Sequence, residues 1–361
     1  MHAMPNLLLT LLFALAAFGC GDSVNLGDNP EHWFDGDAVR GGSTTVPITM
    51  YEGLSPATYA VDDSTLFVTF VEGQPSGFVA VTVKSCDLAS CASTVRVVSQ
   101  QTYPSASAMP TPLLAVAGSE FFFQSRDSMG AQYIGACPKS GCASAPRQVG
   151  FASAPSLVAT DDAIYWCSSS SINRCPREWC DMPTQRSLDA IAHAPGQSAT
   201  KLSFLFVADG YAYIAGPGGV ARVKGDLAAD PDWIYPSELP MGGIAARGDW
   251  VYFSVAALTG QLLRCPVSGC VGDAEVMVSG QRWPSWLAVD DATLYWFNFT
   301  GDDRGESLVT LGAVAVDGSS GPRTVLSKVP LMTNRPIFMN AHHLYWMDAS
   351  DGHTKIRALA K

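Results

Sequence analysis

One short phrase recurs seven times between residues 58 and 346: an apolar run, a polar or glycine turn, and a second run rich in aromatic residues. The clearest copies cover residues 157–166, 287–296 and 337–346, and weaker copies cover 59–67, 114–122, 206–213 and 244–252. The spacing is roughly 40–50 residues, and the 3.6-residue apolar period of helical repeats is absent. Repeats of this kind indicate the four-stranded blades of an all-β propeller.

The last copy supplies only three strands of its blade, which we expect near residues 336–340, 344–347 and 355–360. The β-branched segment 44–51, before the first copy, is suited to be the fourth strand. A blade shared by both ends of the domain closes the ring and leaves no open sheet edge. The sequence therefore predicts a single seven-bladed β-propeller closed by an N-terminal strand, with eight blades as the alternative.

Residues 1–19 are expected to be a signal peptide. The apolar run of residues 7–18 is too short to span a bilayer and has the length of a signal-peptide core. The small residues before Cys20 resemble the lipobox of bacterial lipoproteins, which implies lipid on Cys20. We expect a flexible tether over residues 20–42 and the propeller over residues 43–361. Ordinary secretion as a soluble protein and an uncleaved anchor are the alternatives.

Eight of the ten cysteines form four pairs with four residues between the partners: Cys86 and Cys91, Cys137 and Cys142, Cys175 and Cys180, Cys265 and Cys270. The intervening turns place both partners on adjacent strands of one outer hairpin, so we expect four disulfides worth about 2 kcal/mol each. A Cys₄ zinc site is the alternative, but the pairs belong to different blades. Disulfides indicate an oxidising compartment such as a periplasm or cell surface. The remaining thiol, Cys167, is expected to be buried and inert.

Charge and local composition favour structural roles for most polar residues. A net charge of −11 disfavours nucleic acid and anionic lipid head groups as partners.

Paired aspartates at residues 62–63, 161–162 and 290–291 fit turns between first and second strands. The sixth repeat has a hairpin turn without cysteines at residues 316–321, so the hairpin does not require a bridge.

Ligand-binding candidates lie on the other face, in the loops that join one blade to the next. Aromatic rings and fixed charges there suit a glycan or peptide. The candidates are Trp283, Trp286, Arg282, Arg335, His193 and Tyr103. The sequence contains no G-x-S-x-G, H-E-x-x-H, P-loop or dinucleotide fingerprint, so we assign no catalytic residue, metal or cofactor.

The run Asp-Asp-Ala-Ile-Tyr-Trp at residues 161–166, followed by Arg-Cys-Pro-x-x-x-Cys at 174–180, resembles the repeats of secreted bacterial propeller lipoproteins, especially those of myxobacteria. It is more distantly similar to the YWTD propellers of low-density-lipoprotein-type receptors. The resemblance covers nearly the whole mature chain and implies a lipid-anchored propeller. It implies no receptor activity, because the receptor motif is replaced by Tyr-Trp-Met-Asp at residues 345–348.

Together these features predict a non-catalytic binding or scaffold propeller on the outer membrane, in the periplasm or at the cell surface, with an unknown protein, peptide or glycan ligand. Membrane contact is expected only through the lipid. The alternative is a polysaccharide-active lyase or hydrolase. That alternative would require two carboxylates, or a Tyr with a His and an Arg, converging at one end of the channel.

We predict that the mature protein carries lipid on Cys20, because small residues and a short apolar run precede it. Metabolic labelling with a palmitate analogue should mark the wild type and leave Cys20→Ala unlabelled. Equal labelling of the two proteins would contradict the assignment.

Overall fold

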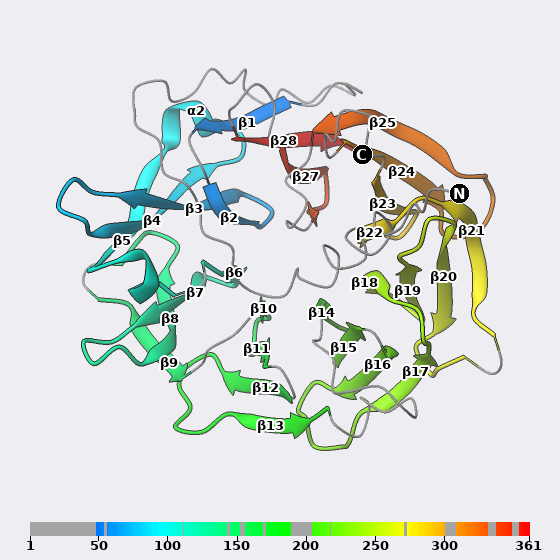
Figure 1. Cartoon of the computed structure of the whole chain (residues 1–361), viewed down its shortest axis with the longest axis horizontal. Coiled ribbons are helices and arrows are strands. Elements are labelled where there is room, and N and C mark those ends of the chain that lie inside the picture. The colour runs from blue at the N-terminus through cyan, green and yellow to red at the C-terminus, as the bar shows by residue number, and fades with distance from the viewer. Residues whose placement is uncertain are drawn as a thin grey trace, which may run out of the picture.

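The computed structural model describes residues 48–53, 56–110, 112–142, 145–151, 156–168, 171–188, 204–216, 218–270, 273–299, 308–330, 337–348 and 354–361. Within them the chain forms seven four-stranded antiparallel sheets that stand around a ring (Figure 1). The prediction of an all-β, seven-bladed propeller is therefore confirmed. The predicted signal peptide, Cys20 and the predicted tether lie outside the described residues.

The strands of each blade are given from the innermost to the outermost. Blade 1 contains β2 (Pro56–Val61), β3 (Thr65–Gly73), β4 (Val79–Asp87) and β5 (Arg96–Tyr103), and blade 2 contains β6 (Leu114–Ala117), β7 (Glu120–Arg126), β8 (Gln132–Pro138) and β9 (Arg147–Phe151). Blade 3 contains β10 (Ser156–Ala159), β11 (Ala163–Cys167), β12 (Ser171–Pro176) and β13 (Thr184–Ser187), and blade 4 contains β14 (Phe204–Ala208), β15 (Tyr211–Gly216), β16 (Gly219–Lys224) and β17 (Asp232–Pro236).

Blade 5 contains β18 (Met241–Arg247), β19 (Trp250–Val255), β20 (Gly260–Pro266) and β21 (Glu275–Gln281), and blade 6 contains β22 (Pro284–Val289), β23 (Thr293–Phe299), β24 (Leu308–Ala315) and β25 (Arg323–Pro330). Blade 7 contains β26 (Phe338–Met339), β27 (His343–Asp348), β28 (Thr354–Ala360) and β1 (Ile48–Gly53). The short helices are α2 (Cys91–Thr94) and the 3-10 helix η1 (Ala106–Ala108).

Blade 7 combines both ends of the described chain. β1 pairs antiparallel with β28, with Ile48 opposite Ala358 and Gly53 opposite Thr354. This confirms closure by an N-terminal strand, and β1 extends two residues beyond the predicted segment 44–51. The first and last described strands therefore meet in one sheet.

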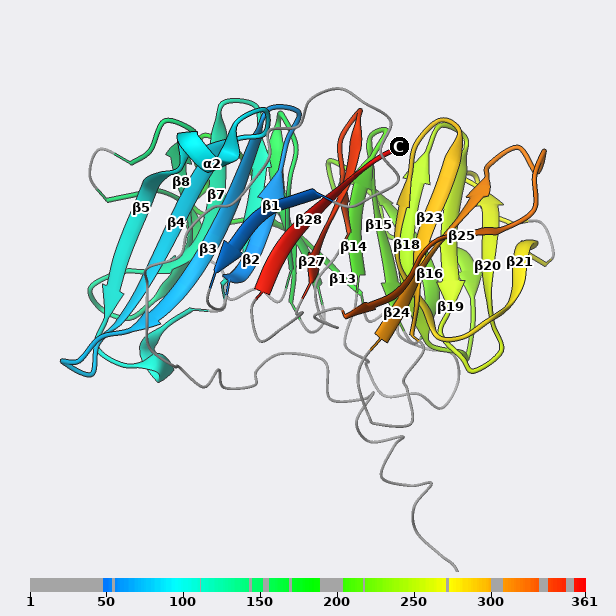
Figure 2. The same cartoon turned by 90° about the horizontal axis from the view of Figure 1, so that it is seen from above.

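The ring has two faces, which Figure 2 shows edge-on. We call one the hairpin face, because it carries the connections from first to second and from third to fourth strands, α2 among them. The opposite face carries the connections from second to third strands and from one blade to the next. The inner strands therefore begin at the opposite face and end at the hairpin face.

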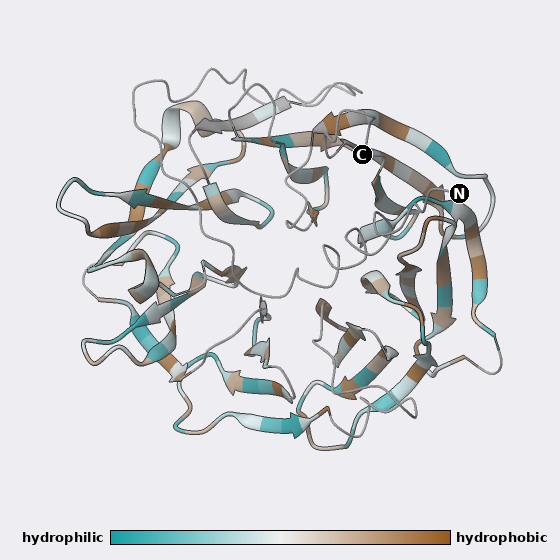
Figure 3. Cartoon of the chain, viewed as in Figure 1, coloured by the Kyte–Doolittle hydropathy of each residue, from teal (hydrophilic) through white to brown (hydrophobic). Residues whose placement is uncertain are grey.

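The apolar core lies between neighbouring blades. The Phe67 ring of blade 1 stacks on the Phe121 ring of blade 2 with centroids 5.3 Å apart, and Trp346 of blade 7 packs in one cluster with Phe297 of blade 6. Figure 3 shows polar residues on outer strands such as β13, whose residues are largely exposed. Each blade depends on its neighbours, because burial stabilises by about 25 cal/mol per Å² of apolar surface.

In every blade one backbone hydrogen bond ties the end of the third strand to the turn between the first and second strands. The N–H to carbonyl pairs are Leu88 to Ser64, Lys139 to Ser119, Arg177 to Asp162, Gly225 to Gly210, Val267 to Asp249, Val316 to Ala292 and Lys361 to His342, at 2.8–3.3 Å. Each acceptor directly precedes the second strand. The polar turn of the repeated phrase is therefore the point where the outer hairpin attaches to the inner one.

The outermost strand of six blades contains a one-residue β-bulge, where the pairing skips a residue. The skipped residues are Met50, Val98, Val149, Ile234, Met277 and Val325. β13 of blade 3 keeps its register over the described pairs. A bulge leaves the backbone groups of one residue outside the ladder and available to other partners.

The next blade binds three of these bulges through its connection between third and fourth strands. The N–H of Cys142 donates to the carbonyl of Val98 at 2.8 Å, that of Cys180 to Val149 at 3.0 Å, and that of Cys270 to Ile234 at 3.3 Å. We call this contact the clasp. Each donor is the second cysteine of a pair, so three of the four second cysteines are seen to make a clasp.

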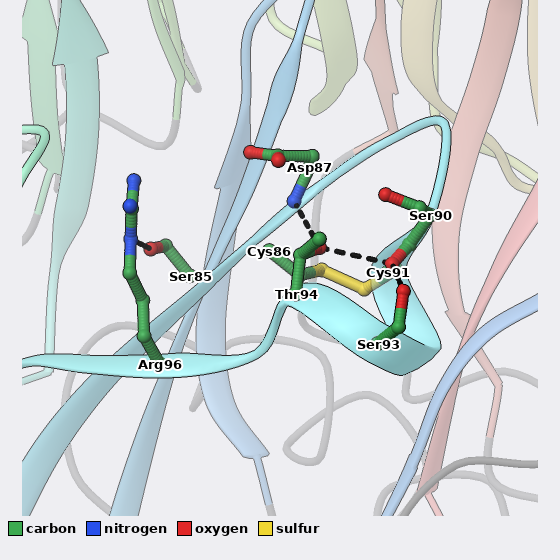
Figure 4. Close-up of a disulfide and its surroundings, with 8 residues drawn as sticks. All are labelled: Ser85, Cys86, Asp87, Ser90, Cys91, Ser93, Thr94 and Arg96. Atoms are coloured by element: carbon green, nitrogen blue, oxygen red, sulfur yellow. Dashed lines mark hydrogen bonds between the residues drawn. A yellow bond between two sulfur atoms is a disulfide. The ribbon is translucent and has the colours of Figure 1, made fainter.

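All four predicted disulfides are present: Cys86–Cys91, Cys137–Cys142, Cys175–Cys180 and Cys265–Cys270. The second cysteine lies in the connection, however, and not on the adjacent strand as the sequence suggested. Cys91 begins α2, whereas β5 begins at Arg96 (Figure 4). In this connection the hydroxyl of Thr94 accepts from the Asp87 N–H and donates to the Ser90 carbonyl. Where a clasp is present, the bridge therefore fixes the residue that makes it.

The cysteine-free turn of blade 6 differs from its predicted register of residues 316–321. The hydrogen bond from Val316 to Ala292 makes Val314 and Ser319 the equivalents of the two cysteines. Blade 4 is also cysteine-free. There Leu227, buried and in the left-handed region at φ 55°, packs in the core shared with blade 3. An apolar side chain thus replaces the bridge, and the hairpin forms without cysteines as expected.

We predict that Cys137→Ser/Cys142→Ser lowers the free energy of unfolding by about 2 kcal/mol in chemical denaturation, because the unfolded chain regains loop entropy. Conversely, Val314→Cys/Ser319→Cys in blade 6 should oxidise spontaneously and raise stability. The matched control Val316→Cys/Gly321→Cys follows the register read from the sequence and should stay reduced. Oxidation of the control alone would contradict the structural register.

Candidate functional site

Part of the channel wall is apolar and accessible. All residues of the inner strands β10 and β14 are half-buried, whereas β2 is buried along its length and β18 everywhere but its last residue. From residue 157 to 159 and from 204 to 208 every side chain is apolar. Concave apolar surface with a few polar groups is the usual character of a ligand site.

Trp286 extends across this wall at the opposite face. Its ring lies edge-on against that of Phe204, with centroids 5.1 Å apart. Trp286 belongs to the inner strand of blade 6 and Phe204 to that of blade 4, so the contact passes over the inner strand of blade 5. Both residues lie near the start of their strands. The aromatic pair therefore lies at the opposite-face mouth of the channel.

The backbone of Trp286 is strained. Its φ is 52°, and the pairing of β22 with β23 shifts there, so that Trp286 and Leu287 together face Trp296. Such a left-handed bulge position normally holds glycine, and a bulky residue there costs about 1–3 kcal/mol. Trp283, which directly precedes β22, also has a positive φ of 49°.

Two glycines of blade 5 make room for this arrangement. A Cβ on Gly242 would lie 2.0 Å from the carbonyl oxygen of Pro284, and one on Gly243 would lie 2.9 Å from the backbone nitrogen of Trp286. The hydroxyl of Ser254 donates to the same Pro284 carbonyl at 2.9 Å. Sequence reasoning missed Phe204 and both glycines, although a Gly-Gly pair in an inner strand is a visible signal of close approach.

Three of the six predicted site residues lie close together in the chain at the start of blade 6. Trp283 is half-buried, and its backbone N–H donates to the Ala257 carbonyl at 2.7 Å. Arg282 beside it is exposed. Arg335 and His193 lie outside the described residues. Trp283, Arg282 and Trp286 are therefore the predicted residues that the structure brings together.

Tyr103 lies elsewhere. It ends the outermost strand of blade 1 and is buried in a cluster with Val79 and Val81. Its hydroxyl donates to the Gln101 side chain at 2.5 Å, and Ser125 of blade 2 donates to the same oxygen. Burial raises the pKa of this phenol above its usual range. The expectation that Tyr103 lies in a loop joining two blades is wrong, because β5 continues through that residue.

The paired aspartates act as turn formers. Asp62 accepts the N–H groups of Ser64 and Thr65 at 2.8 Å, and Asp290 accepts those of Ala292 and Thr293. Burial alone would raise the pKa of Asp62, but the hydrogen bond from Lys139 and the two N–H groups outweigh it and hold that pKa below its usual value. These bonds confirm the turn interpretation.

The hairpin face also carries a hollow of about 450 Å³ beside blade 6. Polar residues line much of it, including Asp291, Ser319 and Arg323. Asp291 is already paired with Arg247 at 2.7 Å, and Asp317 accepts the Ser319 N–H. The hollow thus belongs to the turn network of blade 6.

The remaining thiol has the properties of a structural residue. Cys167 is buried, and desolvation raises the pKa of its thiol to about 12, so the thiolate is not accessible near neutral pH. Among the described residues no three His, Cys, Asp or Glu side chains gather as metal ligands. Within the same residues no helix has the length and hydrophobicity needed to span a bilayer.

No protein-family model matches this chain, and no curated relative matches it. Solved structures do match. The WD40 β-propeller domain of Doa1 is 13% identical with a TM-score of 0.52, over 87% of this chain and 95% of that one. A chain of the mitotic checkpoint complex is 10% identical with a TM-score of 0.54, over 93% and 97%. The computationally designed protein Ika8 is 10% identical with a TM-score of 0.50, over 84% and 94%.

At these identities the likeness shows the fold alone. The chain is a seven-bladed β-propeller with WD40 propellers among its structural neighbours. The resemblance to bacterial propeller lipoproteins and to YWTD propellers stays a prediction.

We predict that Gly242→Ala destabilises the fold by roughly 1–3 kcal/mol, because the added carbon meets backbone that cannot move aside. Tryptophan fluorescence should change as well, since β22 must shift. Gly321→Ala is the control, because a carbon there meets nothing within 4 Å. Equal denaturation midpoints for the two variants would show that β18 and β22 are not in close contact.

Proposed function

We propose that this protein is a non-catalytic binding or scaffold propeller that works outside the cytoplasm, anchored to a bacterial membrane by lipid on Cys20. Its ligand is a protein, peptide or glycan, bound at the opposite-face mouth of the channel. The four disulfides support an oxidising compartment. The propeller fold is compatible with such a role.

One observation carries the choice of site: two tryptophans with left-handed backbone lie within four residues of each other at one mouth. Bulky residues rarely adopt this conformation, and the positions that retain it cluster at ligand sites. Glycine would fit the same backbone without strain. The side chains at residues 283 and 286 therefore have a use that offsets the strain, and binding is the use we infer.

The chemistry of the mouth indicates the class of ligand. The rings of Trp286 and Phe204 and the half-buried apolar residues of β14 offer a surface for aliphatic or aromatic groups or for the apolar face of a sugar. Exposed Arg282 adds one positive charge at the rim. A ligand with an apolar segment beside an acidic or hydrogen-bonding group fits this arrangement.

The polysaccharide-active alternative lacks a corresponding observation. It needs two carboxylates, or a Tyr with a His and an Arg, converging at one end of the channel. In the described part of the inner strands, the accessible wall around Phe204 and Leu157 is apolar. We therefore retain the binding function.

Glycan and peptide arrays probed with the mature domain should identify a ligand, and Trp283→Gly/Trp286→Gly should then abolish its binding. Truncating a buried aromatic anchor costs about 2 kcal/mol or more, equivalent to roughly 30-fold or more in Kd. Glycine suits the positive φ, so the variant should remain folded, which denaturation can verify.

The matched control removes charge from the hairpin face. Asp161→Ala/Asp162→Ala should leave affinity within a few fold, because these residues lie in a turn on the other side of the ring. Loss of binding in this variant, with binding kept in the tryptophan variant, would place the ligand on the hairpin face and refute the proposed site.

A further inference from the structure

Three connections of the opposite face lie together at blade 5 and expose apolar side chains to solvent. They are residues 237–240 between blades 4 and 5, residues 256–259 within blade 5, and residues 282–283 between blades 5 and 6. Leu239 is 54% exposed and Leu258 is 64% exposed. We call the apolar residues of these connections the platform: Leu239, Pro240, Ala256, Ala257, Leu258 and Trp283.

Backbone hydrogen bonds join the three connections. The N–H of Ala256 donates to the Pro240 carbonyl at 2.8 Å, and the N–H of Trp283 donates to the Ala257 carbonyl at 2.7 Å. Each exposed leucine adjoins one of these bonded residues, Leu239 beside Pro240 and Leu258 beside Ala257. The platform is therefore one layer, with the blade 5 connection between the other two.

Close backbone packing fixes this layer. A Cβ on Gly260, which begins β20, would lie 2.3 Å from the Val255 carbonyl oxygen and 2.6 Å from the Cδ of Pro284. The Gly260 N–H also donates to the Ala257 carbonyl at 3.1 Å, so this carbonyl accepts two backbone hydrogen bonds. Apolar residues gathered on a surface mark an interaction site, and a preorganised surface loses little entropy on binding.

The uncharged polar side chains beside the platform are bonded within the protein. The hydroxyl of Ser237 accepts a backbone N–H two residues further on at 3.0 Å, and that of Ser254 donates to a backbone carbonyl of β22. The amide of Gln281 donates to a backbone carbonyl of its own strand and accepts from Asn298 and Trp296. Polar groups that orient a ligand must be free to bond to it. The platform thus suits aliphatic and aromatic groups better than sugar hydroxyls.

Two charges of opposite sign flank the platform. Exposed Glu238 lies on the side of blade 4, and exposed Arg282 lies on the side of blade 6. A polypeptide can complement both, because its side chains carry either sign of charge beside apolar groups. Complementary charges of this kind set the orientation of a bound partner.

We propose that the platform extends the mouth into a docking site for a protein or peptide segment with large apolar side chains. This inference rests on the proposed function and narrows its ligand from three classes to a polypeptide. The apolar side chains of the segment cover Leu239 and Leu258, while a basic side chain faces Glu238 and an acidic one faces Arg282. Trp283 belongs to both the platform and the mouth, so the two form one site.

Selection of random peptides on the immobilised full-length protein tests the proposal. The selected peptides should be enriched in large apolar residues, and Leu239→Ser/Leu258→Ser should raise their Kd about 10-fold or more, because two buried apolar contacts are lost. Both leucines are exposed, so the variant should keep the denaturation midpoint of the wild type.

Phe78→Ser/Met129→Ser is the matched control. It removes exposed apolar side chains from the opposite-face connections of blades 1 and 2, away from the platform, and should leave the Kd within about 3-fold. Wild-type affinity in the platform variant, or equal losses in both variants, would overturn the proposal.

A glycan array separates this inference from the proposed function. A glycan ligand whose binding is abolished by Trp283→Gly/Trp286→Gly would overturn the inference and leave the binding function standing. Failure to bind both the peptide library and the glycan array would overturn both. Self-association of the wild type in sedimentation, abolished by Leu239→Ser/Leu258→Ser, would make a second copy of this chain the occupant and would also overturn the proposal.

Discussion

A backbone hydrogen bond between the outer edge of one blade and the connection of the next fixes the register of three neighbouring blade pairs, 1 with 2, 2 with 3 and 4 with 5. Apolar burial between blades supplies most of the stabilisation, but it is non-directional and does not fix how one blade is placed on another. The clasp does, because the Cys142 N–H reaches the Val98 carbonyl only when both blades are in register. The bulge exposes the acceptor, and the disulfide positions the donor.

At two junctions where the second blade has no disulfide, arginine side chains join the blades. β13 of blade 3 has no bulge in its described pairs, and the following connection, in blade 4, has no cysteines. There Arg186 of blade 3 donates to the Ala228 carbonyl at 3.0 Å, and buried Leu227 fills the core. Arg264 of blade 5 likewise donates to the Val316 carbonyl of cysteine-free blade 6. Arginine donors therefore join neighbouring blades with or without a described clasp, because Arg222 of blade 4 also donates to the Val267 carbonyl of blade 5, beside the Cys270 clasp.

How much was predictable follows from the range of each signal. Strand pairs and cysteine spacings are local, so the blade number, the closure and all four bridges could be read from the sequence. The register of the blade 6 turn and the burial of Tyr103 depend on bulges and strand lengths, which leave no reliable local signal. The contact of Trp286 with Phe204 joins residues 82 positions apart across blade 5, and only the ring geometry brings them together.

The stabilising ties and the two left-handed tryptophans lie on different faces of the ring. The ties, clasps and disulfides lie on the hairpin face, together with ion pairs between neighbouring blades such as Arg177 with Glu120. The opposite face holds the two tryptophans whose backbone costs about 1–3 kcal/mol each. Strain at one mouth persists only if the rest of the ring is fixed independently, because otherwise β22 would relax. A rigid hairpin face therefore allows residues 283 and 286 to be tryptophans, although their backbone conformation favours glycine.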